Sequence, residues 1–120
     1  MNTERRRLKE LTIELRNMTE KAYLQFTEHT SREDYEVDFY GEVKPFADRM
    51  QVLADEWKPL ATDWALKEKP KYVYPIQLKD TYENMTIIAV QAFQKDTREK
   101  RFIAMTKSID YILESIVEQI

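Results

Sequence analysis

The polar residues best placed to do chemistry in this sequence are His29, Tyr40, Glu42, Arg98 and Arg101. At 100° per residue, all but Tyr40 fall on or beside the apolar stripes of predicted helices, near one end of the fold. An imidazole, a carboxylate and two guanidinium groups suit a bound anion or peptide carboxylate. One interpretation is therefore a ligand cup. The favoured interpretation is that these side chains only solvate the end of a bundle, and that Glu42 pairs with an arginine. The predicted floor of the cup is aromatic: Phe26, Phe46, Phe93 and Phe102.

Other reactive constellations are missing from the sequence. There is no cysteine, one histidine and one glycine, so thiolate ligands, paired Glu-x-x-His motifs and glycine-rich phosphate loops cannot form. Haem ligation would need His29 with a methionine such as Met18 or Met105, which fit better as core residues. We expect no metal and no cofactor, and the sequence favours a non-catalytic protein over an enzyme.

A second predicted surface lies on the back of the third helix. Residues 84–93 carry no charge, and Ile87 and Val90 point away from the stripe formed by Met85 and Ala89. An exposed apolar patch there would mark a partner or dimer surface. The alternative is that the connection between the first two helices covers these residues with its own apolar side chains.

These surfaces depend on helices, and the clearest helix spans residues 45–67. Its apolar residues follow spacings of three and four over about six turns. Pro59 interrupts the backbone hydrogen bonding but not the apolar pattern, so we predict one helix bent at Pro59. The apolar positions are Phe46, Met50, Leu53, Trp57, Leu60 and Trp64.

Similar patterns predict four helices at about 3–29, 42–68, 75–93 and 97–120. A capping box is predicted at Asp96–Glu99, and the connection 30–41 carries apolar residues that should pack on the bundle. Four amphipathic helices joined by short turns bury their stripes best as an antiparallel bundle. The predicted fold is all-α: a single domain over 1–120, an up-and-down four-helix bundle with a left-handed twist.

Several blocks of the sequence resemble the YppE-like family, a group of small uncharacterised proteins from Bacillus-type bacteria. The blocks are Asp38–Asp48, Ala54–Trp57, Gln91–Phe93 and Glu99–Phe102, and the first is the most specific. The resemblance covers nearly the whole chain. It implies a left-handed up-and-down four-helix bundle. It implies no activity, and no catalytic or binding residue can be carried over from it.

Composition limits the partners. The net charge is −3, and residues 31–68 hold ten acidic against five basic residues. No dense basic stripe interleaved with aromatic residues suggests nucleic-acid binding, and the Arg5–Arg7 cluster lacks the bulky apolar anchors of a membrane-binding helix. With no secretion signal, we expect a cytoplasmic protein. The favoured function is an interaction module that binds another protein or itself, and the alternative is a small-ligand or anion binder using the cup.

Overall fold

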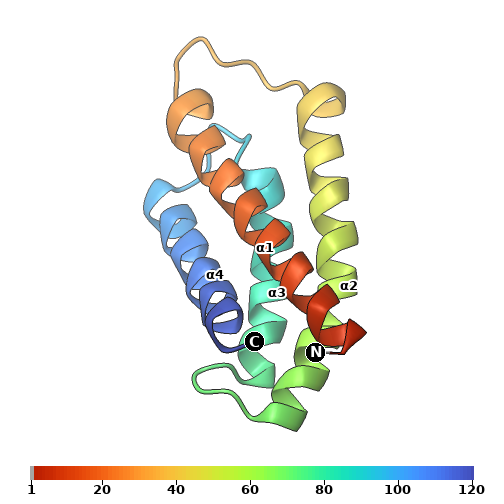
Figure 1. Cartoon of the computed structure of the whole chain (residues 1–120). Coiled ribbons are helices and arrows are strands. Elements are labelled where there is room, and N and C mark those ends of the chain that lie inside the picture. The colour runs from red at the N-terminus through yellow and green to blue at the C-terminus, as the bar shows by residue number, and fades with distance from the viewer. Residues whose placement is uncertain (1) are drawn as a thin grey trace.

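The computed structural model describes residues 2–120 and consists of four α-helices arranged up and down. They are α1 (Thr3–Leu24), α2 (Lys44–Glu68), α3 (Pro75–Gln91) and α4 (Glu99–Gln119), as Figure 1 shows. The described residues contain no strand, and the predicted all-α four-helix bundle is confirmed. We call the end that holds both chain termini the lower end. The upper end is where α1 leads into α2 and α3 leads into α4 (Figure 1).

The helix ends differ from the predicted ends mainly at the upper end. Two π-helical segments, η1 (Gln25–Thr30) and η2 (Phe39–Val43), extend α1 and precede α2. The predicted capping box at Asp96–Glu99 is wrong, because α4 begins at Glu99 after an Arg98 N-cap that makes no side-chain hydrogen bond. The hydroxyl of Thr97, which precedes α4, donates instead to the Gln91 carbonyl at 2.7 Å, and so caps the end of α3.

The core is formed by the predicted apolar stripes. Trp57 is fully buried in the middle of α2, Phe102 is fully buried near the upper end, and Trp64 is buried toward the lower end of α2. Each large side chain removed from water contributes about 1.5–3 kcal/mol, which makes this interior the main stabilising element. Other residues buried in the core include Leu8, Leu11, Leu15, Met50, Leu53, Leu78, Met85, Ile88, Ile109, Leu113 and Ile116.

Helix α2 runs unbroken through Pro59, as predicted. In Figure 1 its lower part, drawn in green, is inclined relative to its upper part, drawn in yellow. Just before the proline, the Trp57 indole N–H donates to the Thr12 hydroxyl oxygen on α1 at 3.1 Å. That hydroxyl donates in turn to the Leu8 carbonyl at 2.7 Å. The buried Trp57 indole and Thr12 hydroxyl at the α1–α2 contact thus both have hydrogen-bond partners.

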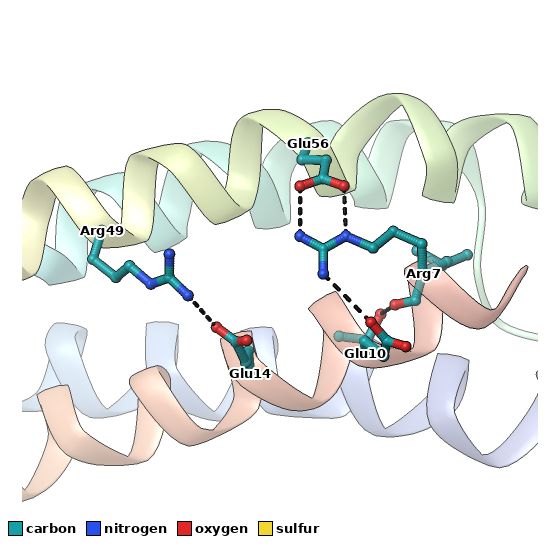
Figure 2. Close-up of polar contacts among 7 residues, drawn as sticks. Arg7, Glu10, Glu14, Arg49 and Glu56 are labelled. Atoms are coloured by element: carbon teal, nitrogen blue, oxygen red, sulfur yellow. Dashed lines mark hydrogen bonds and ion pairs between the residues drawn. The ribbon is translucent and has the colours of Figure 1, made fainter. Parts of the chain in front are cut away.

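Ion pairs along the outside fix the register of α1 against α2. Figure 2 shows Arg7 reaching Glu56 through two parallel hydrogen bonds, Nε–Oε2 at 2.6 Å and Nη2–Oε1 at 2.7 Å. Two turns further along α1, Glu14 accepts from Arg49 at 2.9 Å. The hydrogen bond from Arg7 lowers the pKa of Glu56 below its ordinary value. These side chains are exposed, so they set register more than they add stability.

Candidate functional site

The connection between α1 and α2 is anchored at its start by one buried threonine. Thr30 is the last residue of η1, and its hydroxyl donates to the Ala92 carbonyl at the end of α3 at 2.6 Å. The same hydroxyl oxygen accepts from the Gln25 side-chain amide at 3.1 Å. Two residues after the turn at Ser31, the Lys95 ammonium donates to the Glu33 carbonyl at 2.9 Å. The chain therefore leaves the bundle at a defined point.

The connection returns to the bundle through a second fixed turn, at η2. The Asp38 carboxylate accepts from the backbone N–H of Gly41 at 2.9 Å. A Cβ atom at position 41 would overlap that carboxylate, which explains the glycine in a backbone of ordinary φ. The rings of Phe39 and Tyr40 stack edge to face, 5.2 Å apart between centroids. Such a pair is partly rigid before any partner arrives.

Between these two turns, the apolar side chains face solvent. Val37 and Phe39 are more than half exposed, and Tyr40 is 80% exposed. The prediction that this connection packs on the bundle is wrong for these three residues and right only for Tyr35, which lies against the core. The segment crosses from α1 to α2 above the bundle, where no helix offers a surface (Figure 1).

The same segment is strongly acidic. We call residues 33–42 the acidic connection, since it holds five acidic residues and no basic one. None of the five carboxylates forms an ion pair within residues 2–120, whereas acids along the helices pair with Arg7, Arg16 and Arg49. Tyr35 donates to Glu42 at 3.5 Å, and burial together with that carboxylate raises the pKa of Tyr35. The acids are Glu33, Asp34, Glu36, Asp38 and Glu42.

The five residues of the predicted ligand cup lie at the upper end as expected, but all are exposed: His29, Tyr40, Glu42, Arg98 and Arg101. In the part of the chain that is described, no hydrogen bond or ion pair joins any two of them. Glu42 instead lines a hollow of about 560 Å³ between α1 and α2, together with Met18, Phe46 and Arg49. The predicted aromatic floor does form as two ring pairs, Phe26–Phe102 at 4.7 Å and Phe46–Phe93 at 5.7 Å.

The predicted surface on α3 is smaller than the sequence suggested. Ile87 is 40% exposed, while Val90 is half-buried and packs against the core. Two residues of which one is turned inward make little apolar area for a partner.

Sequence reasoning missed the lower end of the bundle. We call residues 67–76 the basic loop, because it carries Lys67, Lys69 and Lys71 against a single acid, Glu68. It also presents three apolar side chains that are more than half exposed: Tyr72, Tyr74 and Ile76. The signal that could have found it was the run Lys69–Ile76, which holds two lysines, two tyrosines and two prolines within eight residues.

Two residues of the basic loop have left-handed backbones, where glycine is the usual choice. Lys69 ends α2 with φ 49°, and Tyr72 has φ 65°. A side chain in that conformation costs about 1–2 kcal/mol relative to a right-handed backbone. Hydrogen bonds offset the cost: the Lys71 N–H donates to Gln119 Oε1 at 2.8 Å, and Gln119 Nε2 donates to the Lys71 carbonyl at 2.7 Å.

A groove of about 650 Å³ lies between α1 and α4. Arg16 crosses it and donates to Asp110 at 2.9 Å, an interaction that raises the pKa of the guanidinium. Because Arg16 is already paired with Asp110, its guanidinium is not free to bind a ligand in the groove. Elsewhere among residues 2–120, no three His, Asp or Glu side chains gather closely enough to hold a metal ion. None of the described helices is long and apolar enough to cross a bilayer.

Comparison with known proteins places the chain among bacterial proteins without an assigned function. A family model described as a bacterial domain of unknown function, DUF1798, matches residues 12–120. The uncharacterised protein YppE of Bacillus subtilis strain 168 is 26% identical over 113 residues, which cover 94% of this chain and 91% of that protein.

Solved structures give the same result for the fold. A crystal structure of a protein of unknown function from Listeria innocua has a TM-score of 0.90 at 28% identity, covering 98% of this chain and 94% of that one. The crystal structure of YppE from Bacillus subtilis has a TM-score of 0.88 at 24% identity, covering 99% and 94%. The fold is therefore shared over its full length, and the printed descriptions of these relatives assign no activity.

Proposed function

Because this chain belongs to the DUF1798 family, whose function is unknown, we propose a role from its surface: a non-catalytic, cytoplasmic protein-interaction module. The acidic connection is the binding surface, and its partner is a basic protein segment that carries an apolar side chain. The observation that carries the proposal is the exposure of Val37, Phe39 and Tyr40 among five carboxylates without ion pairs.

The two kinds of side chain have separate roles in such a contact. Carboxylates attract a basic segment over about a Debye length and raise the rate of encounter. Aromatic side chains that become buried then supply most of the affinity. The Phe39–Tyr40 ring pair and the Asp38 cap hold the surface in place beforehand, so that little conformational entropy is lost on binding.

The predicted cup and the α3 surface have less support. Among residues 2–120, no hydrogen bond or ion pair joins two of the polar side chains of the cup, and Val90 on α3 is half-buried against the core. Apart from Tyr40, the cup offers a partner charge without exposed apolar area, and the α3 surface offers apolar area without charge. The acidic connection offers both within ten residues.

The test uses a fluorescent peptide of alternating lysine and leucine as the probe. We expect saturable binding that weakens steeply as salt is added. The Phe39→Ala/Tyr40→Ala variant and the Glu33→Gln/Glu36→Gln variant should each weaken binding about tenfold or more. The matched control, Tyr23→Ala/Tyr111→Ala on exposed tyrosines of α1 and α4, should bind like the unmodified protein. Equal binding by all four proteins would refute the proposal.

A further inference from the structure

We infer that the partner of the acidic connection is a second copy of this chain, which docks through its basic loop. This inference rests on the proposed function and names the partner. The two surfaces have matching features: three exposed apolar side chains among five carboxylates at the upper end, and three exposed apolar side chains among three ammonium groups at the lower end.

The charges on both surfaces are largely unmatched within one molecule. Lys69 and Lys71 form no ion pair in the described part of the chain, and neither do the five carboxylates of the acidic connection. Lys67 does pair, with Asp63 at 3.0 Å, and Glu68 pairs with Arg5 at 3.5 Å. Lys69 and Lys71 are thus the cations left to neutralise a partner.

The two surfaces cannot meet within one chain. The molecule is 48 Å long, and the acidic connection and the basic loop lie at its opposite ends (Figure 1). Side chains reach across a few ångströms, so any contact between the two surfaces joins different molecules. Complementary charge at such a contact also disfavours the alternatives, since two acidic or two basic ends repel each other.

The position of both surfaces beside α2 favours a closed pair. The acidic connection leads into the first turn of α2, and the basic loop leaves its last turn. In two antiparallel copies related by a two-fold axis across α2, each acidic connection faces the other copy's basic loop. Both contacts form at once and the assembly closes, as two-fold dimers do. A head-to-tail row would use the same contact but would keep growing.

The experiment measures mass by sedimentation velocity on the full chain, over a concentration series at low and high salt. We expect a reversible species of twice the monomer mass at low salt, and its dissociation at high salt. The variants Lys69→Glu/Lys71→Glu and Glu33→Lys/Asp34→Lys/Glu36→Lys should each raise the dissociation constant at least about tenfold. The control Lys9→Glu/Lys107→Glu makes the same change of charge on exposed lysines of α1 and α4 and should leave the dimer intact.

Mixing the two charge-reversed variants gives the sharpest result. In the first variant the net charge of the basic loop changes from +2 to −2, and in the second the net charge of the acidic connection changes from −5 to +1. Each variant therefore repels itself, and in the mixture opposite charges meet at both contacts. We expect the mixture to recover the dimer. A chain that stays monomeric at all concentrations, or a mixture that fails to recover, would overturn the inference. Species that grow beyond a dimer would overturn the two-fold arrangement. Binding of the lysine–leucine peptide by a strictly monomeric chain would leave the proposed function standing without it.

Discussion

The two ends of this bundle differ in how the segment that joins two helices is held against the core. At the lower end, the segment 69–74 joins α2 to α3 and is held against α4 by paired hydrogen bonds between Lys71 and Gln119. At the upper end, the chain crosses from α1 to α2 over the longer segment 31–38, which is anchored mainly by Thr30. Val73 is buried in the lower loop, whereas Val37 in the upper one faces solvent.

This difference shows that packing constrains the longer connection less than the shorter loop. In the short lower loop, Val73 packs into the interior, while its neighbours Tyr72 and Tyr74 stay exposed. The longer upper connection buries none of Val37, Phe39 and Tyr40, so all three are available for another molecule. Exposure of Val37, Phe39 and Tyr40 would reduce solubility without the carboxylates between them, which explains why acid and apolar residues alternate there.

The largest effect expected is on the two valines. Val73→Asp places a charge at a site that is 2% exposed, and we expect a loss of about 3 kcal/mol or more in the free energy of unfolding. Val37→Asp makes the same change on an exposed residue and should cost less than about 0.5 kcal/mol. Urea denaturation followed by circular dichroism measures both. Similar losses for the two variants would break the comparison between the ends.

The second effect concerns the anchors. Thr30→Val keeps the shape of the side chain but leaves the Ala92 carbonyl and the Gln25 amide without their buried partner, at a cost of about 1–3 kcal/mol. Gln119→Ala removes two exposed hydrogen bonds to Lys71 and should cost about 1 kcal/mol or less.

Amide hydrogen exchange separates the two anchors further. Thr30→Val should speed exchange in the segment 31–38, while Gln119→Ala should speed it only in 69–74. The control is Thr27→Val, whose hydroxyl only donates back to the Tyr23 carbonyl of its own helix at 3.0 Å. If Thr27→Val and Thr30→Val gave the same result, the upper end would have no single anchor.

The sequence was sufficient for the bundle but not for its ends. The three-four spacing from Phe46 to Trp64 predicted α2 and its continuity through Pro59, because periodic burial depends only on helix geometry. The predicted capping box at the start of α4 was wrong, because caps and turns depend on tertiary partners. Thr97 bonds to Gln91 rather than capping α4, and no local pattern reveals that choice.

The predictions for the candidate site were limited in the same way, because tertiary structure decides where its side chains point. The residues of the predicted cup were correctly placed at one end, yet a helical wheel does not give the direction of long side chains such as Arg98 and Arg101. The exposure of Phe39 and Tyr40 could not be predicted either, because their composition suggests burial. Only the path of the chain from η1 to η2 shows that no surface lies beneath them.

The smallest effect on stability is expected for the Arg7–Glu56 ion pair, which lies on the outside of the bundle between its two ends. The hydrogen bond from Arg7 lowers the pKa of Glu56 below the ordinary value of 4.5. The pair therefore stabilises the folded chain above about pH 4.5, and this contribution is lost as the pH falls through the lowered pKa. Glu56→Gln should reduce stability slightly near neutral pH and flatten its dependence on acid.

Thermal unfolding as a function of pH measures this effect. The control Glu83→Gln changes an exposed glutamate on α3 that forms no ion pair within the described residues. It should leave the acid dependence as it is. Added salt should reduce the difference between the two variants, because both glutamates are exposed to solvent. A large loss of stability in Glu56→Gln would mean that polar contacts stabilise the middle of the bundle as well as its ends.

The hydrogen bond from Arg5 Nη2 to the Ile120 carbonyl, 3.2 Å long, has a consequence for the order of folding. It joins residues 115 positions apart and belongs to the contact between α1 and α4. Closing a loop of that length costs more chain entropy than closing the short turn between α2 and α3. The α2–α3 and α3–α4 hairpins, joined by the segments 69–74 and 92–98, are therefore cheaper to nucleate, and the α1–α4 contact becomes favourable only after the helices between them are in place.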